Sequence, residues 1–353
     1  MNEIEDLRKK IDEIDESIIR LLFSRFQISS QIGKIKKERG LPITNEEREI
    51  IVREKWLQKA KQLGFPEPFI DSILNLLFSY SKTFQIYPKE KRRVVVIGYG
   101  GMAKSLSSLL SLAKQEVVIT GRDKDKAERL VNEFNLVYMD PQNAINWGDF
   151  IIFTLPPNAI FSDFSNKLMS YAKGKIISDI SSTKSGTFGR IEEQSIKYGF
   201  SYVSLHPLFG PYLFPVGEKV VIIPSRTSSN ECISKVESFV EDLGLVPVRS
   251  TVDEHDKAMA VAQVLPHFYL LALSLGIEKL SKELGIDYEK FKTTNFKEVL
   301  RLIERLNSIK GVVLEIQKTN PYSQMARDTG LVELNNLFSE LKGDKNDSIR
   351  GKG

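Results

Sequence analysis

Val94-Val-Val-Ile-Gly-Tyr-Gly-Gly-Met-Ala103 is a β-branched run followed by a glycine-rich turn, and a helix is predicted from the turn to Ala113. A strand, a glycine turn and a helix in this order form the dinucleotide fingerprint, in which the helix N-terminus faces a pyrophosphate. We therefore expect a Rossmann-type domain that binds NADP or NAD through the turn residues Gly98, Gly100, Gly101, Met102 and Ala103. Dinucleotide-binding domains usually begin with this strand, so its late position predicts another folded module before it.

The next predicted strands add candidate cofactor contacts. Arg122 follows the strand Val117–Thr120, where NAD-preferring domains tend to carry an acidic residue. An arginine there favours the 2′-phosphate of NADP, and a solvated loop arginine is the alternative. The buried run 151–155 ends at Leu155 and Pro156, the expected position for contacts to the nicotinamide.

The composition narrows the class of protein. At 353 residues the chain is long enough for two or three domains, and its single cysteine favours a reducing, cytoplasmic compartment. The charge is nearly balanced, with 50 Lys and Arg against 46 Asp and Glu, and does not favour nucleic acid as a partner. The polar N-terminus has no signal-peptide core. The uncharged stretch 258–277 is interpreted as a buried helix of a subunit core, not a membrane span, and we predict no metal site.

Residues 1–87 show a helical pattern and no strand pattern. Apolar side chains recur at heptad spacing from Ile4 to Ile35, which predicts one helix of about nine turns that ends at Gly40-Leu41-Pro42. Two shorter helices are expected, one after the capping sequence Thr44-Asn45-Glu46-Glu47 and one from Phe69 to Phe84. The long helix cannot bury its seam alone and needs partner helices.

A cation interrupts this apolar seam. Arg25 lies where a guanidinium is costly unless an anion pairs with it. Lys36 returns to within about 20° of the same helix face, about 16 Å along the axis, so the two cations could converge on one small dianion. A buried ion pair or a register-setting polar residue is the alternative. Arg8, on another face about 26 Å from Arg25, could serve a second copy of the pocket in a two-fold dimer.

Residues 4–85 resemble the all-helical chorismate mutase family. The matching segments are residues 7–15, Leu21-Leu22 with Arg25, Ile32-Gly33-Lys34 with Lys36, residues 40–43, Glu47-Arg48-Glu49, and Ser81 with Gln85. The resemblance implies an intertwined homodimer that rearranges chorismate to prephenate. Arg8 and Arg25 would then hold the carboxylates, and Lys36 and Gln85 would contact the departing ether oxygen.

The resemblance implies that three further polar residues of the protein position the remaining polar groups of chorismate. These residues are Arg48, Glu49 and Ser81. Asn45 stands where some relatives carry Asp, and its amide can still hydrogen-bond a substrate hydroxyl. Gln85 stands where some fused relatives carry Glu, which must be protonated to donate. We therefore expect a mutase activity that is not restricted to acid pH.

Two polar residues follow predicted strands of the second module. His206 ends the strand 202–206 before a Pro- and Gly-rich loop, and Ser182 follows the strand 175–179. Because the carboxyl ends of strands in open α/β sheets carry ligand chemistry, the Ser182 hydroxyl could lie beside His206. A structural histidine is the alternative.

Residues 92–328 resemble prephenate dehydrogenase. The resemblance rests on His206-Pro207-Leu208-Phe209-Gly210-Pro211, on Asp179 with Ser182 and Lys184, and on Glu254-His255-Asp256-Lys257 with Met259. It implies that His206 accepts a proton from prephenate and that Ser182 holds its tautomer. The order of the two modules resembles the bifunctional chorismate mutase–prephenate dehydrogenases, in which the first product is the second substrate.

This organisation predicts a multidomain α and α/β fold. It comprises a helical mutase domain at 1–87, a Rossmann-type domain at 92–248 and a helical substrate and dimerisation domain at 250–342. The last domain is expected to contain helices at 254–284, 296–318 and 328–341.

Candidate substrate residues also lie in this last domain. His267 is a substrate-side group by the resemblance, and a satisfied core histidine is the alternative. The resemblance places the arginine that binds a prephenate carboxylate best at Arg305, with Arg301 one turn earlier as the fallback. His255 and Asp256 are expected to belong to a polar network and not to the chemistry.

Two other functions remain open. An arogenate dehydrogenase on the same scaffold would accept an amine where prephenate has a keto group. An alternative of another class is a nucleotide-sensing regulator with a dead dehydrogenase site. Intact candidate residues argue against such decay, and they are Arg8, Arg25, Lys36, Arg48, Gln85, Ser182 and His206.

Overall fold

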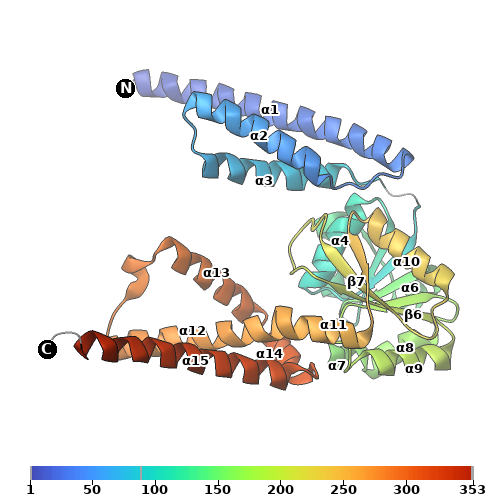
Figure 1. Cartoon of the computed structure of the whole chain (residues 1–353). Coiled ribbons are helices and arrows are strands. Elements are labelled where there is room, and N and C mark those ends of the chain that lie inside the picture. The colour runs from blue at the N-terminus through green and yellow to red at the C-terminus, as the bar shows by residue number, and fades with distance from the viewer. Residues whose placement is uncertain (1, 88–89, 351–353) are drawn as a thin grey trace. The chain divides into compact units, whose positions relative to one another are not determined.

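The computed structural model describes residues 2–87 and 90–350 and divides into two compact units (Figure 1). The first unit comprises Met1–Leu155, Ile160–Ile180 and Ser195–Arg249. The second comprises Pro156–Ala159, Ser181–Gln194 and Ser250–Gly353. The expected fold class is confirmed, because helices occupy both ends of the chain and a mostly parallel sheet lies between them in the sequence.

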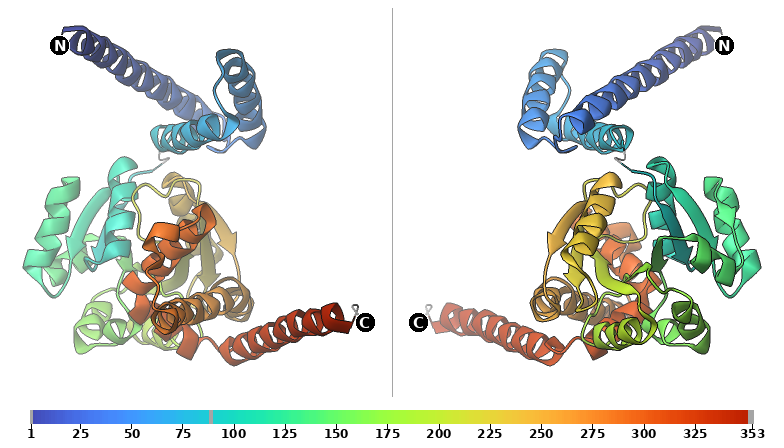
Figure 2. Two further views of the ribbon diagram at one scale, coloured as in Figure 1. Left: turned by 90° about the vertical axis from the view of Figure 1, so that its left-hand side faces the viewer. Right: turned by 90° about the vertical axis from the view of Figure 1, so that its right-hand side faces the viewer.

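Three helices form the N-terminal module, α1 (Asn2–Glu38), α2 (Glu46–Leu63) and α3 (Glu67–Phe84). The Asn45 side chain accepts a hydrogen bond from the Arg48 backbone N–H at 2.8 Å and caps α2. Helices α1 and α2 each pack against α3. The N-terminal half of α1 projects away from both (Figure 2).

The projecting half of α1 leaves its apolar seam in solvent. The side chains concerned are 49–71% exposed, and they are Ile4, Leu7, Ile11, Ile14, Ile18 and Leu21. A seam of this length is stable only against further helices. The long helix α1 was expected to need partner helices, and the helices of the same chain cover only part of its seam.

An eight-stranded sheet forms the core of the rest of the first unit, in the order β3-β2-β1-β4-β5-β6-β7-β8. Strand β1 is paired in parallel with β2 and β4, and its residues Val94 to Ile97 are completely buried, as expected for a central strand covered on both faces. Only the β6–β7 pair is antiparallel among the described strands. The strands are β1 (Arg93–Ile97), β2 (Glu116–Thr120), β3 (Val137–Tyr138), β4 (Phe150–Phe153), β5 (Ile176–Asp179), β6 (Ser201–Pro207), β7 (Lys219–Pro224) and β8 (Val246–Arg249).

Helices connect the strands and supply the apolar side chains that cover the sheet. Leu106, Leu109 and Leu110 of α4 and Val236 and Phe239 of α10 pack into the same core as the strands. The helices are α4 (Gly101–Leu112), α5 (Lys124–Phe134), α6 (Pro141–Trp147), α7 (Pro157–Ile160), α8 (Asp163–Ser170), α9 (Phe188–Tyr198) and α10 (Asn230–Asp242).

The C-terminal part of the second unit is helical, and α12 packs against α13 and α15 (Figure 1). Its elements are α11 (Val252–Met259), the π-helix η1 (Ala260–Val264), α12 (Leu265–Leu284), the 3-10 turn η2 (Tyr288–Phe291), α13 (Thr294–Ser308), α14 (Lys310–Thr319) and α15 (Ser323–Arg350).

Of two helix predictions in this region, one was confirmed and one was wrong. The helix expected over 254–284 is present as one helical segment, Val252–Leu284, in which the π-helix η1 ends just before Pro266, a residue that cannot donate to the helical ladder. The helix expected over 296–318 is broken at Ile309, whose φ of −118° is not helical. The Ser308 side chain donates to the Arg305 carbonyl at this break, an interaction that competes with the helical hydrogen bonds.

The apolar stretch around α12 is not buried within one chain. Among the described residues, Val252–Leu284 is the one helical segment long and apolar enough to span a membrane, and 11% of its apolar window is buried. The expectation of a buried core helix is therefore not met by the single chain. The apolar residues of α12 lie on several faces, and α13 and α15 cover only part of them.

Candidate active sites

The Arg25 guanidinium contacts neutral oxygen atoms of α3. Its Nη1 donates to the Ser81 hydroxyl and, at 3.4 Å, to the Leu77 carbonyl. Burial lowers the pKa of Arg25, which means that its charge is poorly solvated. No carboxylate forms an ion pair with Arg25 among the described residues. The geometry is thus that of a cation held in place by neutral acceptors, with its charge left for an anion.

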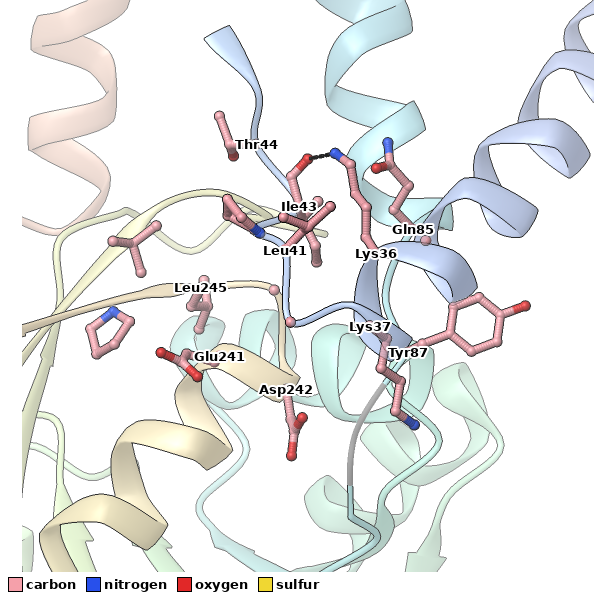
Figure 3. Close-up of a pocket in the computed structure, with 16 residues that line it drawn as sticks. Lys36, Lys37, Leu41, Ile43, Thr44, Gln85, Tyr87, Glu241, Asp242 and Leu245 are labelled. Carbon is pink, nitrogen blue, oxygen red and sulfur yellow. Dashed lines mark hydrogen bonds between the residues drawn. The ribbon is translucent and has the colours of Figure 1, made fainter.

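Lys36 and Gln85 lie beside one another at a cavity of about 320 Å³ (Figure 3). The Lys36 ammonium donates to the Ile43 carbonyl at 2.6 Å, and the Gln85 amide donates to the Ser81 carbonyl at 3.2 Å. The Gln85 Oε1 atom is buried without a hydrogen-bond partner among the described residues. A buried polar atom of this kind is costly unless a ligand or water satisfies it.

A charged pair lies near Lys36, and the sequence analysis predicted a role for only one of its members, Glu49. The Glu49 carboxylate and the Lys82 ammonium are 2.9 Å apart. Burial lowers the pKa of Lys36, Glu49 raises it and Lys82 lowers it, so all three groups belong to one electrostatic cluster. Lys82 immediately follows Ser81 in the sequence, but the sequence analysis predicted a role for Ser81 and not for Lys82.

The remaining predicted mutase residues are exposed in the single chain. Arg8 pairs with Glu5 in the N-terminal part of α1, seventeen residues before Arg25. Arg48 is exposed near the start of α2, and the Asn45 oxygen is used as a helix cap. One chain therefore assembles Arg25, Lys36, Ser81 and Gln85 but not Arg8.

We expect Gly33→Ala to reduce mutase turnover by about 10²-fold, because an ångström of misplacement costs about that much. A Cβ atom at Gly33 would lie 2.3 Å from the Gln85 carbonyl oxygen and 2.5 Å from its Cα. Backbone atoms cannot rotate away, so α1 and α3 must separate and move Lys36 from Gln85. The matched control is Gly189→Ala, where a Cβ meets nothing within 4 Å. Chorismate loss, followed by absorbance, measures both variants, and a Gly33→Ala rate within twofold of the parent would contradict the assignment.

The glycine turn after β1 is built for close backbone approach. At Gly98 φ is +128°, and a Cβ would lie 2.4 Å from the Thr154 Oγ1 atom at the end of β4. At Gly100, which precedes the first turn of α4, a Cβ would meet nothing within 4 Å. The turn therefore leaves open space at a helix N-terminus, where an anion is favoured, and its residues fit a dinucleotide pyrophosphate.

The other predicted cofactor residues surround the carboxyl ends of β2 and β4. Ala103 is buried on α4, and Met102 is half-buried beside it. Arg122 is exposed after β2, and Leu155 and Pro156 follow β4. The neighbouring Asp123 carboxylate accepts from the Lys126 backbone N–H at 3.1 Å and caps α5, which lowers the pKa of Asp123. Among the described residues, no group of three or more His, Cys, Asp or Glu side chains is placed to hold a metal ion.

His206 is 3% exposed on β6, where it pairs with Val221 of β7. The loop that follows it packs on the fingerprint helix α4. A Cβ at Gly101 would lie 2.7 Å from the Pro211 side chain, and the Ser105 hydroxyl donates to the Tyr212 carbonyl. The strand that carries His206 and the glycine turn therefore belong to one region of the first unit.

A buried carboxylate holds the strand that carries His206. Asp179, at the end of β5, accepts hydrogen bonds from the Tyr202 hydroxyl at 2.7 Å and from the Ser204 hydroxyl. Both donors lie on β6, and Asp179 is 1% exposed. These bonds fix β6 a few residues before His206.

A second buried carboxylate, Asp256, holds the segment that contains Ser182. Its oxygens accept from the backbone N–H groups of Lys184 and Ser185 at 3.1 and 2.9 Å and from the Ser185 hydroxyl. The His255 ring nitrogen lies 2.8 Å from it. Burial alone would raise the pKa of Asp256, but the hydrogen bonds from His255, Ser185 and Lys184 outweigh it, and the pKa is lowered. His255 and Asp256 thus form the polar network expected of them.

The substrate-binding residues predicted on the C-terminal helices differ in their exposure to solvent. His267 is half-buried at the start of α12, and burial lowers its pKa, so the ring is neutral near pH 7. Arg301 is 68% exposed and paired with Glu298, and Arg305 is exposed on α13.

The motifs of both modules match known families. Residues 7–86 match the family described as chorismate mutase type II, and residues 109–248 match the family described as prephenate dehydrogenase, nucleotide-binding domain. The chain belongs to the bifunctional fusions of a chorismate mutase with a prephenate dehydrogenase. It is therefore an isomerase and an oxidoreductase on one polypeptide.

Relatives with both modules are similar over most of the chain. The T-protein of Haemophilus influenzae is 23% identical over 289 residues, and that of Enterobacter agglomerans is 26% identical over 286 residues. The alignments cover 79% and 78% of this chain and 71% of each relative. A solved prephenate dehydrogenase from A. aeolicus, in complex with hydroxyphenyl propionate and NAD+, covers 74% of this chain and 97% of its own, with a TM-score of 0.59 at 20% identity. This likeness shows the fold of the dehydrogenase part of the bifunctional chain.

Proposed function

We propose that this enzyme rearranges chorismate to prephenate in residues 1–87 and oxidises prephenate to 4-hydroxyphenylpyruvate in residues 92–342, on the route to tyrosine. The Rossmann-type domain is assigned to 92–248 and the substrate and dimerisation domain to 250–342. The observation that carries the first activity is the pair Arg25 and Lys36, held on one module by neutral oxygen atoms. The glycine turn beside the His206 loop supports the second.

The rearrangement requires no acid, base or nucleophile from the protein. The enzyme must hold the reactive conformer and place donors where negative charge develops on the departing oxygen. We assign the carboxylates to Arg25 and to Arg8 of a second copy, and the ether oxygen to Lys36 and Gln85. The other polar groups of chorismate are positioned by Asn45, Arg48, Glu49 and Ser81. The exposed seam of α1 supports the homodimer that this arrangement needs.

We expect mutase kcat/KM to be flat from about pH 5 to about pH 8, because a glutamine amide donates at any of these pH values. The alkaline limit has a different origin. Only protonated Lys36 carries the positive charge that stabilises the departing oxygen, and burial lowers its pKa, so kcat/KM should fall at a pH below the free lysine value of about 10.4. Initial rates in buffers of constant ionic strength measure both limits. A rate that vanishes near neutral pH would show that another, titrating group is the donor.

In the dehydrogenase, a bound nicotinamide supplies the hydride acceptor. We propose that His206 accepts the proton of the ring 4-hydroxyl, with its tautomer held by Ser182. The carbon that carries this hydroxyl loses its hydride, loss of carbon dioxide then makes the ring aromatic, and the ring oxygen regains a proton from His206. The buried bonds of Asp179 to β6 and of Asp256 to the segment with Ser182 support precise placement of both groups. His267, neutral near pH 7, is assigned to the substrate side.

We propose NADP as the preferred coenzyme, with NAD as the alternative. Arg122 is exposed and has no acidic partner among the described residues, and the Asp123 carboxylate is engaged as a helix cap. We expect Arg122→Ser to raise KM for NADP by about 10-fold or more, because a charge-assisted contact to phosphate is lost. The KM for NAD serves as the internal control and should change little. Equal effects on both coenzymes would remove Arg122 from the phosphate site.

Arogenate is the alternative substrate of the second reaction. The two compounds differ only where a keto group is replaced by an amine, so the relative kcat/KM with each purified compound decides between them. We expect prephenate to be preferred by at least about 10-fold, since the fusion supplies prephenate directly. Absence of both activities in the pure protein would support the regulator alternative. We further propose that the apolar surface of α12 contacts a second subunit. We also propose that the enzyme is cytoplasmic.

A further inference from the structure

The mutase module places a carboxylate among its cations. Arg25 and Lys36 are assigned to a substrate that carries two negative charges. The Glu49 carboxylate raises the pKa of Lys36, which shows that its negative charge acts at the same place. A negative side chain beside a dianionic substrate weakens binding by repulsion. The site therefore needs a group that offsets the charge of Glu49.

Lys82 supplies this offset from another helix. Its ammonium nitrogen lies 2.9 Å from the Oε1 atom of Glu49, and the two side chains are 20% and 30% exposed. Glu49 lies in the first turn of α2 and Lys82 in the last turn of α3, where the helix dipoles favour a negative and a positive charge, respectively. A pair that is shielded from most of the solvent is screened less than a surface pair, so its charges act strongly on their neighbours.

The pair leaves the charge of Lys36 for the substrate. Lys82 lies on the helix that carries Gln85, and its carbonyl accepts from the Gln85 backbone N–H at 3.0 Å. The Lys36 ammonium donates to the Ile43 carbonyl at 2.6 Å and forms no ion pair with Glu49 among the described residues (Figure 3). Of the two cations that act on Glu49, the carboxylate therefore pairs with Lys82 and not with Lys36.

We propose that Lys82 is a positioning residue of the mutase that acts through Glu49. Its ammonium holds the Glu49 carboxylate away from Lys36 and offsets the negative charge of that carboxylate before a dianionic substrate binds. This inference rests on the proposed assignment of Lys36 to the departing ether oxygen. It adds a residue for which the sequence resemblance implied no role.

A second ion pair between the same two helices provides a matched control. The Arg53 guanidinium on α2 lies 2.8 Å from Asp71 and 2.8 Å from Glu67, both on α3. Arg53 is not among the charged groups that shift the pKa of Lys36. Its replacement therefore removes a contact between α2 and α3 and leaves the electrostatics at Lys36 unchanged.

The first measurement is the mutase kcat/KM of Lys82→Gln, Lys82→Arg and Arg53→Gln in the full-length enzyme. We expect Lys82→Gln to lower kcat/KM by about 10-fold, because a released Glu49 carboxylate repels the substrate and attracts Lys36. Lys82→Arg keeps the charge and should restore most of the rate. Arg53→Gln should resemble the parent enzyme, since an exposed ion pair contributes little. Prephenate oxidation should be unchanged in all three variants.

A double variant tests whether Lys82 acts through Glu49. Glu49→Gln alone should lower the rate, because Glu49 is itself assigned to the substrate. Without the carboxylate there is no charge to hold away from Lys36. Adding Lys82→Gln to Glu49→Gln should therefore change kcat/KM by about threefold at most, which is less than its effect in the parent enzyme.

The pH dependence gives a readout that a purely structural role would not change. Protonated Lys36 is the active form, so kcat/KM falls as the pH rises through the pKa of Lys36. Glu49 raises this pKa and Lys82 lowers it. Lys82→Gln should therefore move the alkaline limit to higher pH, and Glu49→Gln should move it to lower pH, while Lys82→Arg and Arg53→Gln leave it in place. The other ionisable side chains at the cavity beside Lys36 are the same in every variant, and they are Lys37, Tyr87, Glu241 and Asp242.

Three results would overturn the role of Lys82. They are a parental kcat/KM in Lys82→Gln, an equal loss in Lys82→Gln and Lys82→Arg, and an alkaline limit that stays in place in Lys82→Gln. If Lys82→Gln does not fold, the other two variants decide: the limit must move to lower pH in Glu49→Gln and stay in place in Lys82→Arg, and any other pair of results contradicts the proposal. A parent enzyme that does not convert chorismate would instead refute the proposed mutase function.

Discussion

His206→Asn is expected to lower prephenate oxidation by about 10²- to 10⁴-fold, the usual contribution of a general base. The asparagine amide keeps a polar group on β6 but cannot accept a proton near neutral pH. Prephenate binding should therefore persist while kcat falls. Initial rates of coenzyme reduction measure kcat, and calorimetric titration in the absence of coenzyme measures binding.

The fusion supplies its own control for this variant. His206 lies on β6, whereas the mutase residues lie on α1 and α3, so the chorismate mutase rate should equal that of the parent enzyme. Coenzyme affinity should also be unchanged. If His206→Asn oxidises prephenate at the parental rate, His206 is a structural histidine and another base must be sought.

Arg25→Gln is expected to lower mutase kcat/KM by about 10²- to 10³-fold, because a substrate carboxylate would lose its charged partner. The stability of the free protein should not fall. Burial lowers the pKa of Arg25, so its charge is a cost without a bound anion, and a neutral side chain removes that cost. Chorismate disappearance and thermal unfolding of the ligand-free enzyme measure the two effects.

The matched control for this variant is Arg20→Gln on the same helix. Arg20 is 78% exposed and paired with Glu16 one turn away, so its loss should change neither activity nor stability appreciably. A mutase rate that survives Arg25→Gln, or a large loss of stability in the free protein, would indicate that Arg25 has a structural role.

Much of the fold follows from local patterns in the sequence. The β-branched run 94–97 and the glycine turn predict the central strand and α4, and the heptad seam predicts a single long helix that ends before Gly40. The cationic pair on α1 was predictable because helical geometry places residues 25 and 36 on one face. These features depend on short-range spacing, which the sequence records directly.

The features that could not be predicted depend on contacts between distant residues. Two exceptions are local: the break at Ile309 and the π-helix η1 arise from hydrogen bonding that no period in the sequence reveals. Lys82 gains its position from Glu49 on another helix. The arginines on α13 were favoured from anchors in the sequence, and their role as carboxylate ligands stays a prediction.

The most direct test of the account is one absorbance experiment on the purified chain, first with chorismate alone and then with NADP or NAD added. We predict loss of chorismate and accumulation of prephenate in the first stage, followed by reduction of the coenzyme and appearance of 4-hydroxyphenylpyruvate in the second. If chorismate is unchanged, or if prephenate forms and neither coenzyme is reduced, the two-step enzyme described above is contradicted.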